Sequence, residues 1–243
     1  MKIKNWVRLP LKNAYNVRDL GGYACQNGET TRWRIFLRAD NLTHLDADEI
    51  QLLKDYGVRT VIDLRSREEC AILPDPFLED AGVHYLNIPL ITENVADVTK
   101  TITGKAPQDF LKSFYIELIE HGQGVIKQIL TEIASHGDGC LLFHCAAGKD
   151  RTGIVAMLLL GLAGVGAPDI VSNYEVTYTC LRQDSKFFEA AGPIPIEVCM
   201  SKPEYIEHVM AHIQGRYGGI PEYLERIGLP HETAETIRRR MRE

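Results

Sequence analysis

One stretch of the sequence decides both the fold and the chemistry of this chain, and it reads Leu141-Leu142-Phe143-His144-Cys145-Ala146-Ala147-Gly148-Lys149-Asp150-Arg151-Thr152-Gly153. Its apolar start is typical of a strand, and the apolar run from Gly153 to Val165 is typical of a buried helix. The order is therefore strand, loop, helix. Because the first N–H groups of a helix lack partners and carry positive partial charge, a loop that curls onto a helix start forms a cradle for an anion. Small residues at positions 146, 147 and 148 let the backbone close around a ligand the size of phosphate.

Cys145 and Arg151 stand at the two ends of this loop, with five residues between them. The field that attracts an anion also favours a cysteine thiolate, so we expect Cys145 to be an ionised nucleophile. Arg151 offers a planar fork of N–H donors to two phosphoryl oxygens, which a lysine could not match. The hydroxyl of Thr152 is expected to donate to the sulfur of Cys145. The loop thus combines an anion site with a nucleophile.

Strand-like and helical segments alternate along the first two thirds of the chain, and the last third is helical. This order predicts an α/β fold with a mainly parallel central sheet flanked by helices on both faces, in a single domain over residues 1–243. The expected strands are Arg34–Arg38, Val58–Leu64, His84–Ile88 and Cys140–His144, and the expected helices are Asp46–Tyr56, Gln108–Glu120, Gly124–Ser135, Pro168–Thr179, Pro203–Gln214, Pro221–Ile227 and Glu232–Arg240.

The composition excludes several classes of protein. A formal charge of −6 and a pI near 5.8 argue against binding of nucleic acid through a basic surface. Six cysteines in 243 residues are too few for a disulfide scaffold, and we expect reduced thiols. No signal peptide and no apolar run of about 20 residues are present, which predicts a cytoplasmic protein without an integral membrane segment and leaves non-classical export open. Nothing indicates the oligomeric state.

The spacing His-Cys-x5-Arg-Thr-Gly resembles the signature loop of the protein tyrosine phosphatase superfamily. Within that superfamily, the loop sequence Ala-Ala-Gly-Lys-Asp-Arg is similar to that of the atypical bacterial and fungal tyrosine/lipid phosphatases. This is the triple-specificity group that includes mycobacterial tyrosine phosphatase B. Four further stretches resemble the same group, so that the likeness covers nearly the whole chain: Asn16–Gly22, Leu37–Asp40, Val58–Ser66 and Tyr217–Leu229.

The resemblance implies cysteine-dependent hydrolysis of phosphomonoesters through a cysteinyl-phosphate, without cofactor or metal. The implied substrates are a protein carrying phosphotyrosine, with phosphoserine, phosphothreonine or a phosphoinositide as further candidates. In this group the proton donor is the aspartate inside the loop, here Asp150, and the adjacent Lys149 contacts phosphate or the substrate head group. The residues expected to bind phosphate or substrate are Ala146, Ala147, Gly148, Lys149, Thr152 and Gly153.

Other members of the superfamily carry their acid on a separate loop, so that Glu93 and Asp97 are the alternative proton donors. Asp63 and Arg65 follow an expected strand, where they line the rim of the pocket or form a structural ion pair.

The Asn16-x-Arg18-Asp19 motif is interpreted as structural, a brace for the turn at Gly21-Gly22. His144 is expected to orient the loop rather than to act as a base. The eight histidines are scattered, which argues against a metal site.

Two other functions use a similar loop. A catalytically silent module would recognise phosphorylated partners without turnover, but Cys145, Asp150 and Arg151 together argue against it. A sulfur-transfer enzyme of the rhodanese kind also curls a loop around a cysteine, although the Arg-Thr-Gly start of the helix fits a phosphatase better.

Overall fold

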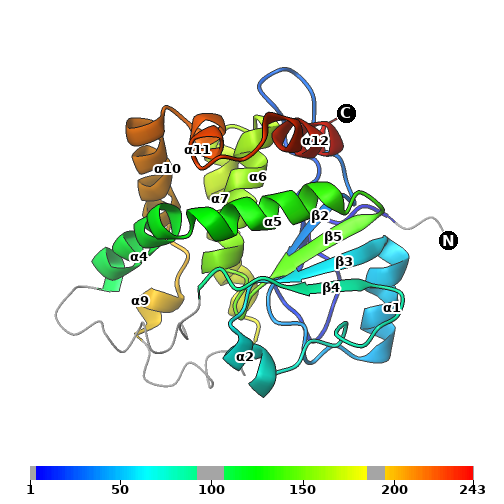
Figure 1. Ribbon diagram of the computed structural model, residues 1–243. Coiled ribbons are helices and arrows are strands. Elements are labelled where there is room, and N and C mark those ends of the chain that lie inside the picture. The colour runs from blue at the N-terminus through cyan, green and yellow to red at the C-terminus, as the bar shows by residue number, and fades with distance from the viewer. Residues whose placement is uncertain (1–3, 92–106, 185–194, 243) are drawn as a thin grey trace.

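The computed structural model describes residues 4–91, 107–184 and 195–242. In these residues five strands form one sheet in the order β1-β2-β5-β3-β4 (Figure 1). The pairs β2–β5, β5–β3 and β3–β4 are parallel, and only β1 pairs antiparallel, with β2. This confirms the predicted mainly parallel sheet, whose strands are β1 (Arg18–Asp19), β2 (Phe36–Ala39), β3 (Val58–Asp63), β4 (His84–Asn87) and β5 (Cys140–His144).

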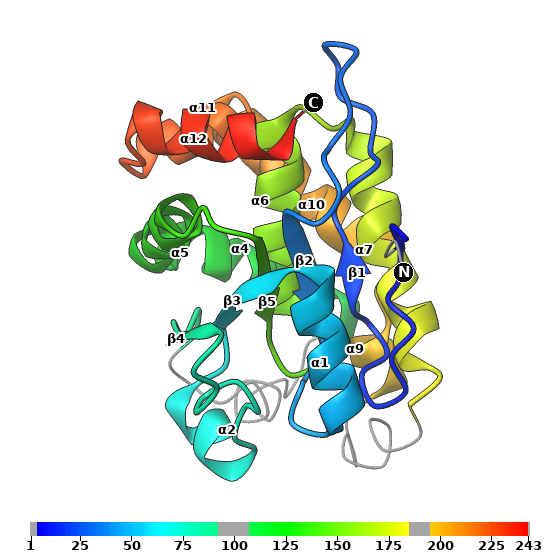
Figure 2. The same cartoon turned by 90° about the vertical axis from the view of Figure 1, so that its right-hand side faces the viewer.

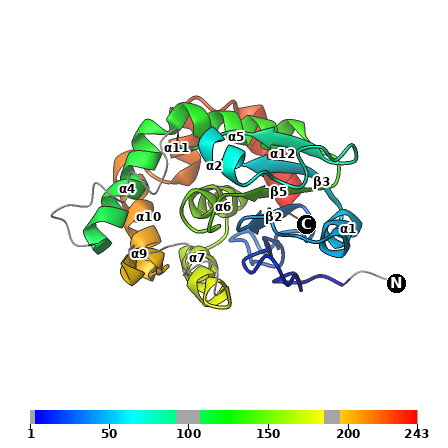
Figure 3. The same cartoon turned by 90° about the horizontal axis from the view of Figure 1, so that it is seen from below.

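Helices cover both faces of the sheet, as predicted. Side chains of β5 alternate between the faces: Leu141 and Phe143 join the apolar core with α5, whereas Leu142 packs in a second core with α1. α5 and α1 accordingly lie on opposite sides of the strands (Figure 2 and Figure 3). The last third is helical, and the helices of the described residues are α1 (Ala47–Tyr56), α2 (Arg67–Ile72), α4 (Pro107–His121), α5 (Gln123–Ser135), α6 (Asp150–Ala163), α7 (Ala167–Leu181), α9 (Ile196–Cys199), α10 (Pro203–Tyr217), α11 (Ile220–Arg226) and α12 (His231–Met241).

α6 is the central helix, and twelve of its fourteen residues are buried. Such all-round burial explains why its sequence is apolar without a polar stripe. A side chain at Gly161 would run into Ile220 of α11, so glycine allows α11 to pack closely against α6. α6 therefore has a fixed place in the core, and its first turn is fixed with it. Among the described helices, none combines the length and apolar character that crossing a membrane requires.

Glu49 ties the N-terminal segment to α1. Its backbone N–H binds the side chain of Asp46, and its carboxylate accepts in return from the N–H of Asp46, in a capping box. The same carboxylate accepts from the backbone of Lys12 at 2.5 Å and of Asn13 at 2.9 Å. One buried side chain thus satisfies donors from two segments and places the chain that leads to Asn16.

Replacing Glu49 by alanine is expected to lower the free energy of unfolding by about 2 kcal/mol, because several buried or part-buried N–H groups lose their acceptor. Asp48→Ala is the matched control, since Asp48 is an exposed acid in the same first turn. Urea unfolding of both variants measures the difference. Equal stability of the two would contradict the role given to Glu49.

Candidate active site

The loop between β5 and α6 presents a row of unpaired N–H groups. Residue 153 is the first whose N–H finds a backbone partner, the carbonyl of Lys149 at 2.9 Å. Among the described residues, the N–H groups of residues 146–151 have no hydrogen-bond acceptor. Cys145 directly precedes them, and it is only 2% exposed. Gly148 has a φ of 63°, and a side chain there would run into the backbone of Ala39 and Asp40. The end of β2 thus packs directly against the loop, and only glycine fits at position 148.

Arg151 is held by Glu69 of α2. Its Nη1 lies 2.6 Å from Oε2 of Glu69 and its Nη2 lies 2.9 Å from Oε1, which makes the pair bidentate. Burial opposes the charge of Arg151, but Cys145 and Glu69 outweigh it and raise the pKa of the guanidinium. The Nε atom is buried without a partner among the described residues. That N–H group is free to bind a phosphoryl oxygen.

Sequence reasoning missed Glu69. Its signal was present as Ser66-Arg67-Glu68-Glu69, a capping-box pattern directly after a strand end. In the structure the Glu69 carboxylate accepts from the N–H of Ser66 at 2.8 Å and binds Arg151 as well. The box therefore anchors the glutamate that orients the arginine.

Asp150 begins α6 and lies at the edge of the site, with its side chain 17% exposed. The hydroxyl of Tyr115 donates to its Oδ1 at 2.5 Å, and Tyr174 lies 2.6 Å from the same hydroxyl. Nζ of Lys149 is 3.2 Å from Oδ1. These contacts hold a carboxylate beside the loop in one orientation. The alternative acids Glu93 and Asp97 lie outside the described residues.

The side chain of Lys149 extends past Asp150 toward α9. This side chain is buried, and the ammonium donates to the carbonyls of Val198 and, at 3.3 Å, Met200. Lys149 thus joins the loop to α9, where the resemblance had suggested a contact with substrate. The hydroxyl of Thr152 is also buried and has no hydrogen-bond partner among the described residues, so the expected bond to the sulfur of Cys145 is not formed.

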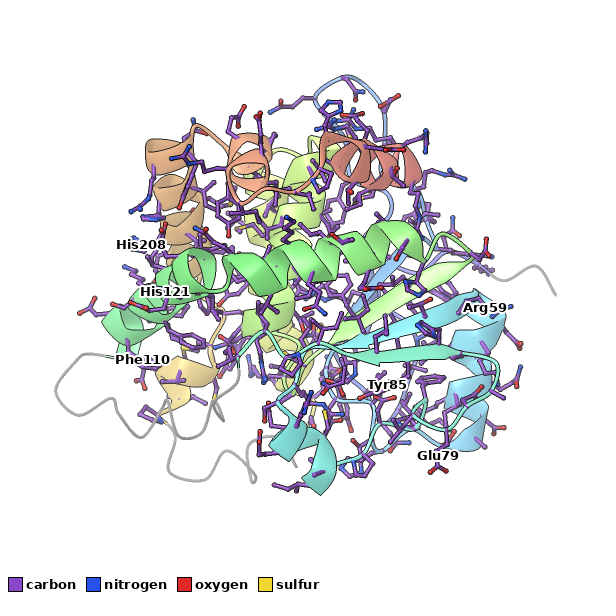
Figure 4. All side chains as sticks on the ribbon, viewed as in Figure 1. Arg59, Glu79, Tyr85, Phe110, His121 and His208 are labelled. Carbon is purple, nitrogen blue, oxygen red and sulfur yellow. The ribbon has the colours of Figure 1, made fainter. Side chains whose placement is uncertain are left out.

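Asp63 and Arg65 do not line a rim. Both are buried, and they pair with each other at 2.7 Å, so the alternative of a structural ion pair holds. The pair stands behind His144, whose Nε2 lies 3.2 Å from Asp75 and 3.6 Å from Asp63. Burial opposes protonation of His144, but the two carboxylates outweigh it and raise its pKa. Tyr85, labelled in Figure 4, donates to Asp63 at 2.9 Å.

Asp63, Asp75 and His144 also place three potential metal ligands close together. The residues present do not favour a cation there. The guanidinium of Arg65 already pairs with Asp63, and the raised pKa of His144 favours the protonated ring that a metal ion would have to replace. The cluster is better described as a buried charge network that fixes His144, whose carbonyl accepts from Leu64 at 2.8 Å.

Comparisons with known proteins cover nearly all of the chain. A model of the tyrosine phosphatase family matches residues 9–243. The chain is 34% identical over 218 residues to a tyrosine-protein phosphatase of Nostoc commune, covering 85% of this chain and 74% of the relative. It is 24% identical over 272 residues to the triple specificity protein phosphatase PtpB of Mycobacterium tuberculosis, covering 94% of this chain and 96% of the relative. Among solved structures it is similar to TpbA of P. aeruginosa, with 14% identity, a TM-score of 0.38, and coverage of 82% of this chain and 89% of that chain.

Glu69→Gln is expected to lower kcat/KM for a phosphomonoester roughly 10- to 100-fold, because the neutral amide holds the Arg151 fork less firmly and small misplacements at a reacting centre are costly. Glu68→Gln, an exposed neighbour in the same turn, serves as the control. Steady-state kinetics on both variants measures the effect. Wild-type turnover by Glu69→Gln would show that Arg151 needs no partner.

Proposed function

Since the chain belongs to the tyrosine phosphatase family, we propose that it hydrolyses phosphomonoesters through a phosphorylated intermediate on Cys145. The observation that carries this proposal is the row of unpaired N–H groups over residues 146–151, directly after a buried cysteine and at the start of a buried helix. Together with Nε of Arg151, they form a set of donors aimed at a tetrahedral oxyanion. A silent module would not need Cys145 and Asp150 beside these donors.

The reaction has two steps. The thiolate of Cys145 attacks phosphorus, the bond from phosphorus to the ester oxygen breaks, and the leaving oxygen takes the proton of Asp150. Water then attacks phosphorus, gives a proton to the Asp150 carboxylate, and the phosphorus–sulfur bond breaks to release inorganic phosphate and the thiolate. The loop N–H groups and Arg151 stabilise the oxygens that gain charge in both steps. Tyr115 keeps the carboxylate of Asp150 in place.

We propose phosphotyrosine in a protein as the preferred substrate. The Nostoc relative is named a tyrosine-protein phosphatase, and the mycobacterial one a triple specificity phosphatase. Recognition of a phosphoinositide head group needs cations beyond those that bind the reacting phosphate. Lys149, the cation expected to serve this purpose, donates to the carbonyls of Val198 and Met200. This favours the phosphotyrosine protein over the lipid.

The free cysteines favour a reducing compartment as the location of the enzyme. All six are free thiols, and a nucleophilic thiolate requires a compartment that keeps it reduced. We therefore propose that the enzyme works in the cytoplasm.

The wild type is expected to hydrolyse a phosphotyrosine peptide in the presence of EDTA, with a kcat/KM above those for a phosphothreonine peptide and a phosphoinositide. Cys145→Ser should reduce turnover of all three by about 10³-fold or more, since the nucleophile is lost. Cys25→Ser, at the far end of the core beside Val165, is the matched control and should retain activity. Release of inorganic phosphate measures all reactions.

Two results would count against this assignment. Tight binding of the phosphotyrosine peptide without turnover by the wild type would favour the silent module. A higher kcat/KM on the phosphoinositide would overturn the choice of substrate while leaving the mechanism intact.

Asp150→Asn is expected to slow hydrolysis of phenyl phosphate by roughly 10²- to 10⁴-fold, the usual contribution of a general acid. Hydrolysis of p-nitrophenyl phosphate should fall much less, because its leaving group needs no proton. The basic limb of the pH–rate profile should also flatten. Tyr115→Phe should change the rates in the same direction by a smaller factor, since it loosens the carboxylate.

Glu93→Gln and Asp97→Asn are the competing variants for this experiment. If either of them produces the dependence on leaving group and Asp150→Asn does not, the proton donor is outside the loop.

A further inference from the structure

Two buried arginines stand behind the phosphate loop. Arg18 of β1 and Arg38 of β2 face each other across the antiparallel pair and are 2% and 0% exposed. Neither forms an ion pair with a carboxylate of the described residues. A buried charge without a counter-ion is expensive, so neutral acceptors or a function must compensate. The Asn16-x-Arg18 motif was expected to brace the turn at Gly21; Asp19 alone does this, by accepting from the N–H of Gly21 at 2.8 Å.

The acceptors of the two guanidinium groups belong to the loop and to α7. Nη2 of Arg38 donates to the carbonyl of Gly148 at 2.6 Å, and its Nη1 donates to Oδ1 of Asn173 at 2.6 Å. Arg18 donates from Nη1 to the carbonyl of Asn173 at 2.6 Å and from Nη2 to Thr177 at 2.8 Å. Carbonyl, amide and hydroxyl oxygens thus satisfy the Nη groups while leaving the positive charges in place, and Nε of Arg38 is buried without a partner among the described residues.

Asn16 connects Arg18 to the loop. Nε of Arg18 donates to Oδ1 of Asn16 at 3.0 Å, which fixes the amide with its NH₂ group on the other side. That NH₂ group donates to the carbonyls of Ala147 at 3.2 Å and Gly148 at 3.1 Å. Two consecutive carbonyls of the loop are therefore held by Asn16, and the second is also held by Arg38.

The hydrogen bonds to these two carbonyls fix the direction of two N–H groups of the loop. In a trans peptide the C=O and the N–H point in opposite directions. The carbonyls of Ala147 and Gly148 face Asn16 and Arg38, so the N–H groups of Gly148 and Lys149 in the same peptides point away from them, toward the cradle. Neither N–H has an acceptor among the described residues. The arginines thus act on the donors that would bind phosphate.

The charge of Arg38 also acts on the nucleophile. Burial, and then the neighbouring Arg18, lower the pKa of Arg38 to about 9, so it remains charged at neutral pH. Arg38 lies opposite Phe143 in the register of β2 and β5, two residues before Cys145, and it donates to Gly148, three residues after Cys145, so its charge lies close to the nucleophile. The other titratable groups that act on this pair of arginines are Arg8, Tyr23, Asp40, Tyr174 and Cys180.

We propose that Arg38, supported by Arg18 and Asn16, is a positioning residue of the phosphate loop: it turns the N–H groups of Gly148 and Lys149 toward the substrate and favours the thiolate of Cys145 with a charge that no carboxylate cancels. This inference rests on the proposed function of the loop. It assigns to the Asn16-x-Arg18 motif a role at the site rather than in a turn.

The experiment measures the reactivity of Cys145 and the binding of phosphate by the loop, and it does not depend on turnover. The rate of alkylation of Cys145 by iodoacetamide is measured against pH, and inorganic phosphate is titrated as a protecting ligand. In Arg38→Met the alkylation midpoint should move to higher pH by about one unit, the smallest effect expected for loss of a nearby opposite charge. Protection should require at least about tenfold more phosphate, a loss of roughly 1.4 kcal/mol.

Two further variants distinguish the effect of the charge of Arg38 from the effect of the hydrogen bonds to the loop carbonyls. Arg38→Lys keeps the charge but not the fork, so its alkylation midpoint should stay near that of the wild type while phosphate protection weakens. Asn16→Leu removes the bonds to the two carbonyls without changing any charge, and it should show the same pattern. Arg240→Met is the control, because Arg240 is a half-buried arginine that donates to the carbonyl of Ile133 and lies over Phe36 at the start of β2, at the end of the strand that is farther from the loop.

Wild-type midpoints and phosphate protection in Arg38→Met and Asn16→Leu would overturn the proposal and leave the arginines a purely structural role. If Arg38→Met does not fold, Asn16→Leu and Arg38→Lys decide the result. Failure of the proposed function is distinguishable, since a wild type that protects Cys145 with phosphate but turns over no phosphomonoester would refute catalysis and leave the positioning role standing.

Discussion

The site is organised around the N–H groups at the start of α6, which have no acceptor among the described residues. Residues 146–151 expose donors that no described residue accepts, next to a cysteine that is 2% exposed. Backbone donors at the start of a helix favour binding of an anion. α6 makes the arrangement possible because it is buried on all sides and cannot shift to relieve it. The fold therefore holds the loop in a conformation whose N–H groups are available to the phosphate of the proposed substrate.

Charges surround this loop in three different ways. Arg151 is paired with Glu69, and its pairing leaves Nε free toward the site. His144 lies between Asp75 and Asp63, which keeps the residue before the nucleophile in a balanced network. Arg38 has no carboxylate partner among the described residues and donates to the loop itself. The first pair orients Arg151, the second fixes the strand end at His144, and the third is the contact through which Arg38 is proposed to position the loop.

The part of the site that sequence could predict is the part that is local in sequence. Strand, loop and helix follow one another over residues 140–163, so spacing alone brings Cys145 and Arg151 to one anion cradle. The direction of a long side chain is a tertiary property. Lys149 and Arg151 are two residues apart, yet one points to the carbonyls of α9 and the other to Glu69. For the same reason the sequence left two alternatives open for Asp63 and Arg65, a pocket rim or a structural ion pair, and the structure shows a buried pair.

The choice of acceptors for Arg38 explains why such a charge is kept in the core. A carboxylate behind the loop would satisfy the guanidinium more strongly, but it would also cancel the field felt by a thiolate or a phosphate in front of it. Carbonyl and amide oxygens accept from the Nη groups of Arg38 with only partial charges, and its Nε has no partner among the described residues, so most of the positive potential remains. They also belong to the loop and to α7, which means that the contacts that offset the cost of burial are the contacts that orient the loop. The same hydrogen bonds therefore contribute to stability and to the positioning of the loop. A variant that replaces the buried arginine with an apolar residue would gain stability and lose the positioning of the loop.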